Sequence, residues 1–217
     1  MPTLLYIDTS GNIATVALSQ KGKQLAIRHH ENANEQAAVL NNMIASVLAE
    51  AGITLQDIDA LCVCAGPGSY TGLRVGLSTA KGLCYALDKP ILLFNRLDLL
   101  AIEFNPNTDF AIVLKARAGE YFYAQYNQVA AITIAPKHAL EQDLIDSIDS
   151  NPSLKMITDD PDLTLTDNKI LIPSPHRISV PTWIPLGEKR FESAEFNDLA
   201  YCEPFYLKAA YTTQSKK

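Results

Sequence analysis

Two short segments carry polar residues in an order that could bind a phosphate group or a divalent cation. The first is Asp8-Thr9-Ser10, which directly follows the apolar residues 4–7. The second is the glycine-rich segment 66–71, which lies between the apolar residues 60–65 and a helical pattern. A strand, a glycine-rich turn and a helix in succession direct backbone N–H groups and a positive helix end at an anion. A carboxylate at a strand end can hold Mg²⁺.

The candidate phosphate or nucleotide residues are the polar, glycine and cationic residues of these segments: Asp8, Thr9, Ser10, Gly66, Gly68, Ser69, Thr71 and Arg74. Each segment also has a structural interpretation, which we favour. The Asp8 carboxylate can cap its own turn. Pro67 and Gly68 can shape a sharp turn, with Ser69 or Thr71 as the helix N-cap.

The helix predicted over residues 71–87 contains glycines that each cost about 1 kcal/mol relative to alanine. Close packing within the lobe or a helix pair across a subunit interface would offset this cost, and the sequence leaves both open. The candidate protein-interface residues are Gly72, Val75, Gly76, Thr79, Ala80 and Gly82. On that assignment, a bulky residue in place of Gly76 disrupts association and leaves the fold intact.

The composition is that of an ordinary globular protein, with 217 residues, 47% hydrophobic and 19% charged. The net charge of −6 argues against direct, tight binding of a nucleic-acid backbone. No run approaches the roughly 18 apolar residues of a membrane span, and no basic leader precedes residue 4, so we expect a cytoplasmic protein without a membrane partner. The four cysteines and four histidines show no metal-ligand spacing, and no catalytic Ser-His-Asp or Cys-His set is evident.

The apolar pattern predicts two cycles of a strand meander followed by alternating helices and strands. In the first cycle we expect strands at 4–8, 15–19, 24–28, 60–65 and 91–95, and helices at 33–51, 71–87 and 97–104, with Gly52 as a helix C-cap. In the second we expect strands at 110–114, 120–126, 129–135 and 154–158 and a helix at 139–148. Residues 159–186 should form loops with a short strand at 170–172, and residues 188–201 should form a helix.

This organisation predicts an α/β protein with a first lobe over 1–104, a second, reduced lobe over 105–210 and a flexible tail over 211–217. Two βββαβαβα lobes resemble the two-lobed actin, hexokinase and Hsp70-like ATPase (ASKHA) fold, which duplicates a ribonuclease-H-like lobe. The motifs are similar to those of the TsaB (YeaZ) family, namely Leu4-x-x-Ile7-Asp8-Thr9-Ser10, the segment 66–76 (GPGSYTGLRVG), Ala116-Arg117-x-Gly119-Glu120-x-x-Tyr123 and Glu203-Pro204-x-Tyr206-Leu207-Lys208.

The resemblance implies a non-catalytic partner subunit of the complex that makes N6-threonylcarbamoyladenosine at position 37 of tRNA. Its partners would be a TsaD-like transferase and a TsaE-like ATPase, with a homodimer when alone and tRNA contacted only through the complex. No cofactor or metal is expected, and ATP or ADP at a subunit junction stays open. The alternative from another class is an independent nucleotide-dependent phosphotransferase or ATPase that uses Asp8 and residues 66–71, and a metallopeptidase is a distant third.

The chain departs from the family pattern at two places. The parent enzymes carry an HxxxH metal motif on the helix after the first meander, whereas residues 32–40 here contain no histidine, and Gln36 and Leu40 are poor metal ligands. Family members commonly carry Asp where Lys115 stands, and a lysine would compete with a divalent cation. Lys115 could contact a phosphate or extend into solvent. Arg117 and Glu120 are expected to pair with each other.

Overall fold

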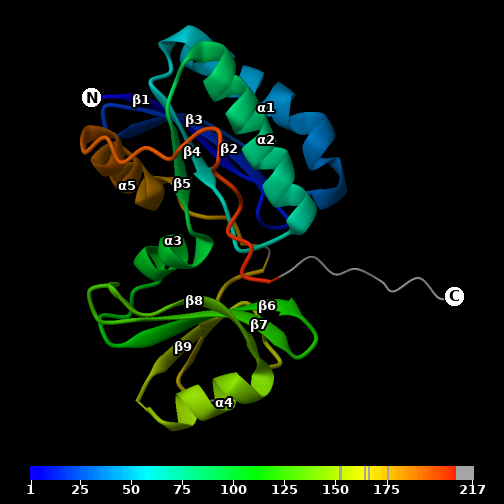
Figure 1. The fold of residues 1–217 in the computed structure, drawn as a ribbon, viewed down its shortest axis with the longest axis vertical. Helices are drawn as coiled ribbons and strands as arrows, with labels where there is room; N and C mark the ends of the chain where they lie inside the picture. Colours follow the sequence, from blue (N-terminus) through cyan, green and yellow to red (C-terminus); the bar gives the residue numbers. More distant parts are fainter. Residues whose placement is uncertain (152, 164, 166, 175, 209–217) are drawn as a thin grey trace, which may run out of the picture.

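The chain folds into two five-stranded mixed sheets stacked one above the other with a helix between them (Figure 1). The computed structural model describes residues 1–151, 153–163, 165, 167–174 and 176–208. The first sheet has the order β3-β2-β1-β4-β5, with strands β1 (Thr3–Asp8), β2 (Ala14–Gln20), β3 (Lys23–His30), β4 (Ala60–Cys64) and β5 (Ile91–Phe94). The second has the order β10-β9-β6-β7-β8, with β6 (Phe110–Arg117), β7 (Glu120–Tyr126), β8 (Ile132–Leu140), β9 (Lys155–Thr158) and β10 (Lys169–Leu171).

Each helix of the first half has a capping residue at one end or both. A short 3-10 turn η1 (Ala33–Glu35) leads into α1 (Gln36–Ala51), which ends at the left-handed Gly52, as predicted. After the 3-10 turn η2 (Leu55–Asp57) and β4 comes α2 (Tyr70–Leu87), whose N-cap Ser69 accepts a hydrogen bond from the Gly72 amide. Asn95 caps α3 (Arg96–Glu103) in the same way.

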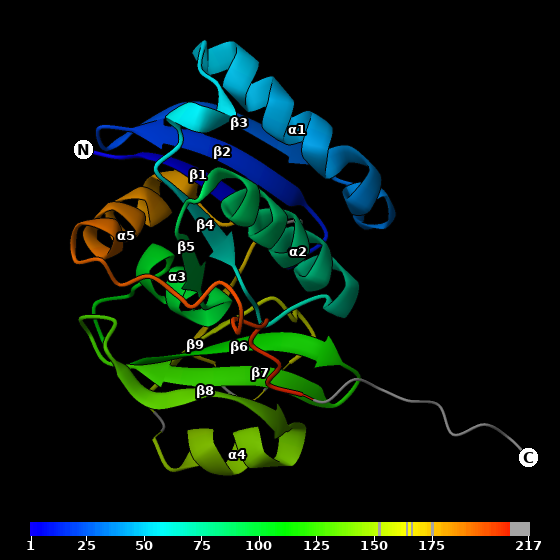
Figure 2. The same ribbon diagram turned by 45° about the horizontal axis from the view of Figure 1, so that its top comes forward.

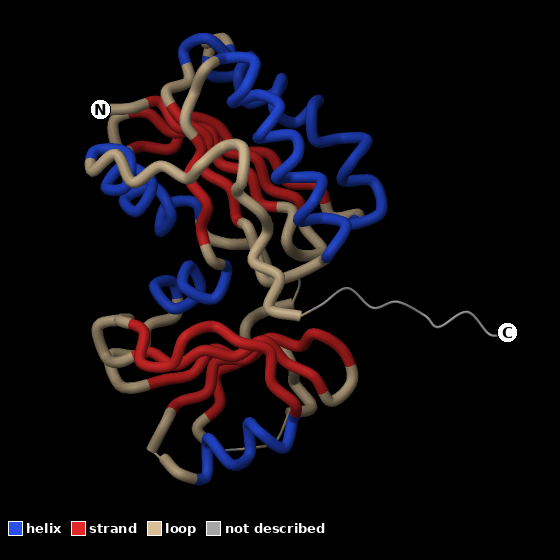
Figure 3. The backbone as a smooth tube through the Cα atoms, viewed as in Figure 1, coloured by secondary structure: helices blue, strands red, loops and turns tan. Residues whose placement is uncertain are grey.

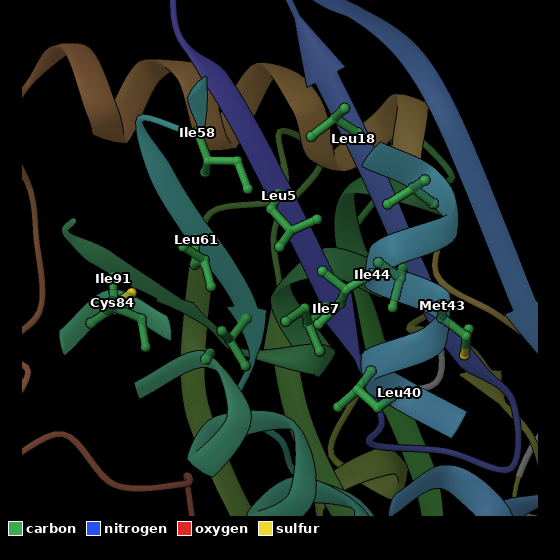
Figure 4. Packing of buried hydrophobic residues seen from close by; sticks show 14 of the residues in the cluster. Leu5, Ile7, Leu18, Leu40, Met43, Ile44, Ile58, Leu61, Cys84 and Ile91 are labelled. Carbon is green, nitrogen blue, oxygen red and sulfur yellow. The ribbon is translucent and has the colours of Figure 1, made fainter. Parts of the chain in front are cut away.

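Strand β1 is buried on both sides, because helices cover both faces of the first sheet. Leu5 and Ile7 point toward α1 and α2, and Figure 4 shows them facing Leu40 and Ile44 of α1. The alternate residue Tyr6 points the other way and packs edge-on against Trp183 of α5 (Val180–Glu192). Alternation along a strand thus produces two separate cores in the first lobe.

The second sheet is covered by α3 on the side of the first lobe and by α4 (Glu141–Asp149) on the other (Figure 3). Leu97 and Leu100 of α3 pack on the second sheet, whereas Leu99 packs with the core of the first lobe. The sequence predicted that this helix would close the first lobe. The structure places it between the lobes instead, where it contacts both.

These layers confirm the predicted fold class, a two-lobed ASKHA-type α/β fold with a reduced second lobe. The predicted lobe boundaries at residues 104 and 105 stay a prediction, but the chain does not remain in the second lobe after that point. Helix α5 returns to the first sheet, and residues 197–208, here called the C-terminal strap, run back from β5 toward the second sheet (Figure 1). The predicted tail at 211–217 lies outside the described residues. Among the helices that the structure describes, none is long and apolar enough to cross a membrane.

Two elements differ from the sequence-based prediction. The last helix is predicted at 188–201 but spans 180–192. Pro181 stands in its first turn, where the missing N–H removes no hydrogen bond. Burial of Trp183 and Ile184 against the first sheet stabilises the helix despite Pro185 in its interior. Strand β8 was predicted at 129–135 but spans 132–140, paired antiparallel with β7. The structured part of 159–186 otherwise contains the short strand β10, as expected.

Candidate functional site

The Asp8 carboxylate, a candidate phosphate or cation site, is engaged in hydrogen bonds within its own turn. Asp8 is buried, and its Oδ1 accepts hydrogen bonds from the Ser10 backbone N–H (2.8 Å) and the Ser10 hydroxyl (2.6 Å). Thr9 turns the other way and donates its hydroxyl to the Gly72 carbonyl of α2 at 2.7 Å. The side chains of the Asp8-Thr9-Ser10 turn thus hold the turn and its neighbour helix together.

The glycine-rich segment 66–71 is docked onto this turn. The Ser69 amide donates to the Ser10 carbonyl at 2.8 Å, and the Gly66 carbonyl accepts from the Arg96 amide at 2.6 Å. A Cβ at Gly68 would lie 2.1 Å from the Ser10 carbonyl oxygen, so only glycine permits this approach. Part of the N–H set that would cradle an anion is therefore used inside the lobe, and Thr71 is exposed at the start of α2.

The same contacts correct the interface assignment for three of the six residues. Gly72, Gly76 and Ala80 are buried against their own lobe. A Cβ at Gly72 would lie 2.0 Å from the Thr9 carbonyl oxygen, and one at Gly76 would lie 2.3 Å from Thr9 Oγ1. A bulky residue at Gly76 would therefore disturb the fold, contrary to the prediction.

The other three predicted interface residues lie toward the outside of α2. Val75 and Thr79 are half-buried and Gly82 is exposed, and a Cβ at Gly82 would meet no atom of another element within 4 Å in the described part of the chain. Helices α1 and α2 lie side by side on one face of the first sheet (Figure 2). Their uncharged outer face consists of the exposed residues Ala38, Asn41, Ala45, Ala49, Ser78, Gly82, Tyr85 and Ala86.

The second hairpin, β6–β7, carries two ion-pair groups. Lys115 does not extend freely into solvent: its Nζ lies 2.9 Å from Oδ2 of the buried Asp160. Burial would raise the pKa of Asp160, but hydrogen bonds from Lys115, the Asp162 amide and Tyr121 outweigh it and hold that pKa below its usual range. The Asp159 carboxylate accepts the Lys115 backbone N–H at 2.7 Å.

Glu120, at the start of β7, is bound by side chains from three parts of the chain. They are Arg117 (2.5 Å, as predicted), His138 of β8 (2.7 Å) and Lys208 of the C-terminal strap. Hydrogen bonds from Lys208 and then Arg117 lower the pKa of the Glu120 carboxyl to about 2. This cluster ties the end of the strap to the second lobe.

A cavity of about 640 Å³ lies between the lobes, bounded by the Asp8 turn, the glycine-rich segment, the β6–β7 hairpin and the strap. Its charged lining residues include Arg96, Lys115 and Asp159. Arg74, predicted to assist phosphate binding, points instead to the strap: its Nε donates to the Tyr206 hydroxyl at 2.9 Å, and its guanidinium lies 4.1 Å from the centre of the Tyr70 ring.

The described residues give no constellation for metal or nucleophilic chemistry. No group of three His, Cys, Asp or Glu side chains within the described part of the chain could share a metal ion. Cys62, Cys64 and Cys84 are buried, and burial raises the pKa of each thiol, that of Cys84 to about 12, so none is activated. The absence of a cofactor and of a metal stays a prediction.

Sequence reasoning missed Arg96, Asp159 and Asp160. Each lies within two residues of the end of a short strand, β5 or β9, which was a usable signal because the strand ends along one edge of a sheet gather at a cleft. Their convergence with Lys115 depends on how the two lobes are stacked, and that stacking is not visible in local pattern.

Comparison with known proteins places the chain beside tRNA-modification proteins. A family model described as TsaD, tRNA N6-adenosine threonylcarbamoyltransferase, matches residues 18–152. The tRNA threonylcarbamoyladenosine biosynthesis protein TsaB of Haemophilus influenzae is 33% identical over 126 residues, which cover 57% of this chain and 53% of that protein. TsaB of Escherichia coli is 33% identical over 129 residues, 58% of this chain and 55% of that protein.

The chain thus spans about half the length of the curated relatives it matches. The solved structure of YeaZ from Pseudomonas aeruginosa is 23% identical and superimposes with a TM-score of 0.77, covering 95% of this chain and all of that one. At that identity the likeness shows the fold.

Proposed function

The chain belongs to the TsaD family and, within it, to the TsaB (YeaZ) group, and from this membership we propose that it is a non-catalytic partner subunit in tRNA N6-threonylcarbamoyladenosine formation. In this role it binds a TsaD-like transferase, works with a TsaE-like ATPase and meets tRNA only through the complex. Alone, it forms a homodimer. We place this work in the cytoplasm.

The observation that carries the proposal is the uncharged outer face of α1 and α2. Residues 36–49 include no charged residue, and α2 carries only Arg74 and Lys81, both of which bind the strap. A solvent-exposed helix face normally bears charges, whereas the core of a protein interface is depleted of them and enriched in tyrosine. Tyr85, in the last turn of α2, is 84% exposed on this face. The face therefore suits a second protein better than water.

The state of the turn residues supports a subunit without its own catalysis. Asp8, Ser10 and Ser69 are engaged in one another's hydrogen bonds or in helix capping. A phosphotransferase would need the Asp8 carboxylate free for a cation, so no observation at this turn favours that alternative. ATP turnover by the purified chain that is lost in Asp8→Ala would favour it over the partner role.

The test is association with the cognate TsaD-like transferase, measured by calorimetry with wild type and Gly82→Arg. The Gly82 position is open and arginine is the better helix former, so the fold is retained. A charged side chain buried at the contact should weaken binding at least about tenfold, or roughly 1.4 kcal/mol. Gln142→Arg, on the exposed part of α4, is the matched control and should bind like wild type. Absence of binding by wild type, or equal binding by both variants, contradicts the proposal.

A further inference from the structure

The C-terminal strap holds one tyrosine ring out in solvent. Tyr201 is 84% exposed, the same fraction as Tyr85 of α2. Tyrosine is enriched among the residues that anchor protein interfaces, because its ring buries a large area at a low cost in side-chain entropy. Single exposed apolar residues are nevertheless common on protein surfaces, so exposure by itself does not mark a binding site.

The backbone around Tyr201 is fixed by hydrogen bonds within its own turn. One oxygen of the Asp198 carboxylate accepts the amides of Ala200 at 2.8 Å and Tyr201 at 3.1 Å. The Asp198 carbonyl accepts the Cys202 amide at 2.9 Å. These bonds form within the strap itself, so Tyr201 projects from a turn that is ordered before any partner binds.

Lys81 of α2 ties this turn to the first lobe. Its Nζ donates to the carbonyls of Ala200 and Cys202, each at 3.1 Å, and these two contacts flank Tyr201. Leu199 and Cys202 pack against the core of the first lobe beneath the turn. A backbone that is already ordered loses little entropy on binding, which favours affinity.

Tyr201 lies at the edge of the uncharged outer face of α1 and α2. Lys81 and Tyr85 are four residues apart and therefore neighbours on the surface of α2. Because Lys81 contacts the backbone on both sides of Tyr201, the two exposed tyrosines belong to the same edge of the helix. Helix α2 lies between α1 and the strap, as Figures 1 and 2 show. The strap thus extends the outer face on the side away from α1.

A second copy of the chain fits this arrangement. Six of the eight residues of the outer face are alanine, serine or glycine, so a ring from another molecule can approach the helix backbones closely. In a two-fold dimer both copies offer the same surface, and a tyrosine of each can pack on the small residues of the other. Two chains of net charge −6 repel each other, and an uncharged face is where they can meet with the least repulsion.

We propose that Tyr201 anchors a two-fold homodimer by packing on the small residues of the other copy's outer face, and that Lys81 positions the turn that presents it. The strap is then part of the contact as well as a link between the lobes. This inference rests on the homodimer of the proposed function, and it adds to the two helices a contact residue from a distant part of the chain.

The experiment is sedimentation equilibrium of the full chain over a range of protein concentrations. Tyr201→Ser should raise the dimer dissociation constant at least about tenfold, as expected for the loss of an anchoring aromatic residue. Its urea midpoint should equal that of wild type at concentrations where both are monomeric, because the ring is exposed in the single chain. Val129→Ser removes an exposed apolar residue of the second lobe, is the matched control and should dimerise like wild type.

A double-mutant comparison tests the role of Lys81. Lys81→Met frees the carbonyls of Ala200 and Cys202, so it should weaken dimerisation and accelerate amide exchange in residues 200–202. In the Tyr201→Ser background the same change should weaken dimerisation little further, because no ring is left to position. Additive losses would show that Lys81 does not act through Tyr201.

Gly82→Arg separates this inference from the proposed function. If Gly82→Arg weakens the dimer and Tyr201→Ser does not, the role of Tyr201 is overturned and the helix face stands. If neither variant weakens the dimer, both are overturned as homodimer contacts. A wild-type chain that stays monomeric overturns the inference and the homodimer, and leaves the transferase contact to its own calorimetric test.

Discussion

Lys115 and Asp160 form an ion pair whose members differ strongly in exposure. The Asp160 side chain is 2% exposed and that of Lys115 44% exposed. The Lys115 ammonium group therefore balances the charge of a buried carboxylate. Removing it should leave Asp160 buried and unpaired, which is a more costly state than losing an exposed pair.

Lys115→Met should accordingly lower stability at neutral pH. The folded pKa of Asp160 lies below its unfolded value of roughly 4, so the pair contributes stability above pH 4 and loses it as pH falls through the folded pKa. The difference in urea midpoint between wild type and variant should be largest near pH 7 and shrink toward pH 3. An equal difference at both pH values would mean that Lys115 acts through packing rather than charge.

At this scale the sequence predicted roles well where the contacts are local. The Asp8 turn and the Arg117–Glu120 pair join residues only two or three positions apart, and the structure contains both, as the sequence analysis favoured. Lys115 pairs with Asp160, 45 positions later in the chain, and Gly76 packs against Thr9, 67 positions earlier. Sequence spacing alone therefore could not predict what either residue contacts.

Helix α2 has two faces that the glycine pattern does not distinguish. Gly72 and Gly76 let the helix approach the Asp8 turn, whereas a Cβ at Gly82 would meet no atom of another element within 4 Å among the described residues. Packing within the lobe thus requires glycine at positions 72 and 76, whereas no contact with another described element requires glycine at position 82. This assignment replaces the predicted single interface stripe.

The two glycine classes should respond oppositely to alanine. Gly76→Ala places a Cβ 2.3 Å from Thr9 Oγ1 and should destabilise the protein by about 1–3 kcal/mol. Gly82→Ala should stabilise it by about 0.5–1 kcal/mol, because alanine is the better helix former at an open position. Urea unfolding of both variants measures this, and a similar shift for the two would refute the assignment.

The elements themselves were predictable where periodicity was uninterrupted. Helices α1 and α2 have regular apolar spacing and clear caps, and the structure confirms them within a few residues. Helix α5 was displaced in the prediction because Pro181 and Pro185 signal a break, while its burial against Tyr6 comes from a strand 177 positions earlier. Tertiary packing overrode local propensity there.

The two lobes are joined by α3 and by the C-terminal strap. The strap donates the Phe205 amide to Ala65 in the first lobe and pairs Lys208 with Glu120 in the second. It also closes one side of the interlobe cavity. Docking of the strap should therefore set how firmly the lobes are held together.

Glu120→Gln should loosen the strap. Neutral glutamine cannot pair with Lys208 and Arg117, so amide exchange of residues 203–208 should accelerate, while Glu35→Gln, an exposed control on the first lobe, should leave it unchanged. With the folded pKa of Glu120 near 2, wild type should keep the strap docked down to about pH 4 and lose it progressively toward pH 2. Unchanged exchange in Glu120→Gln would show that the strap is held by other contacts.

The central claim, a partner subunit without catalysis of its own, is tested most directly by reconstituting tRNA modification from purified proteins. N6-threonylcarbamoyladenosine would be measured by mass spectrometry in reactions containing the TsaD-like and TsaE-like proteins, with and without this chain. We predict that modification requires the chain and falls when Gly82→Arg replaces it, in step with the lost association. Full modification without the chain, or with a Gly82→Arg variant that no longer binds the transferase, would contradict the account.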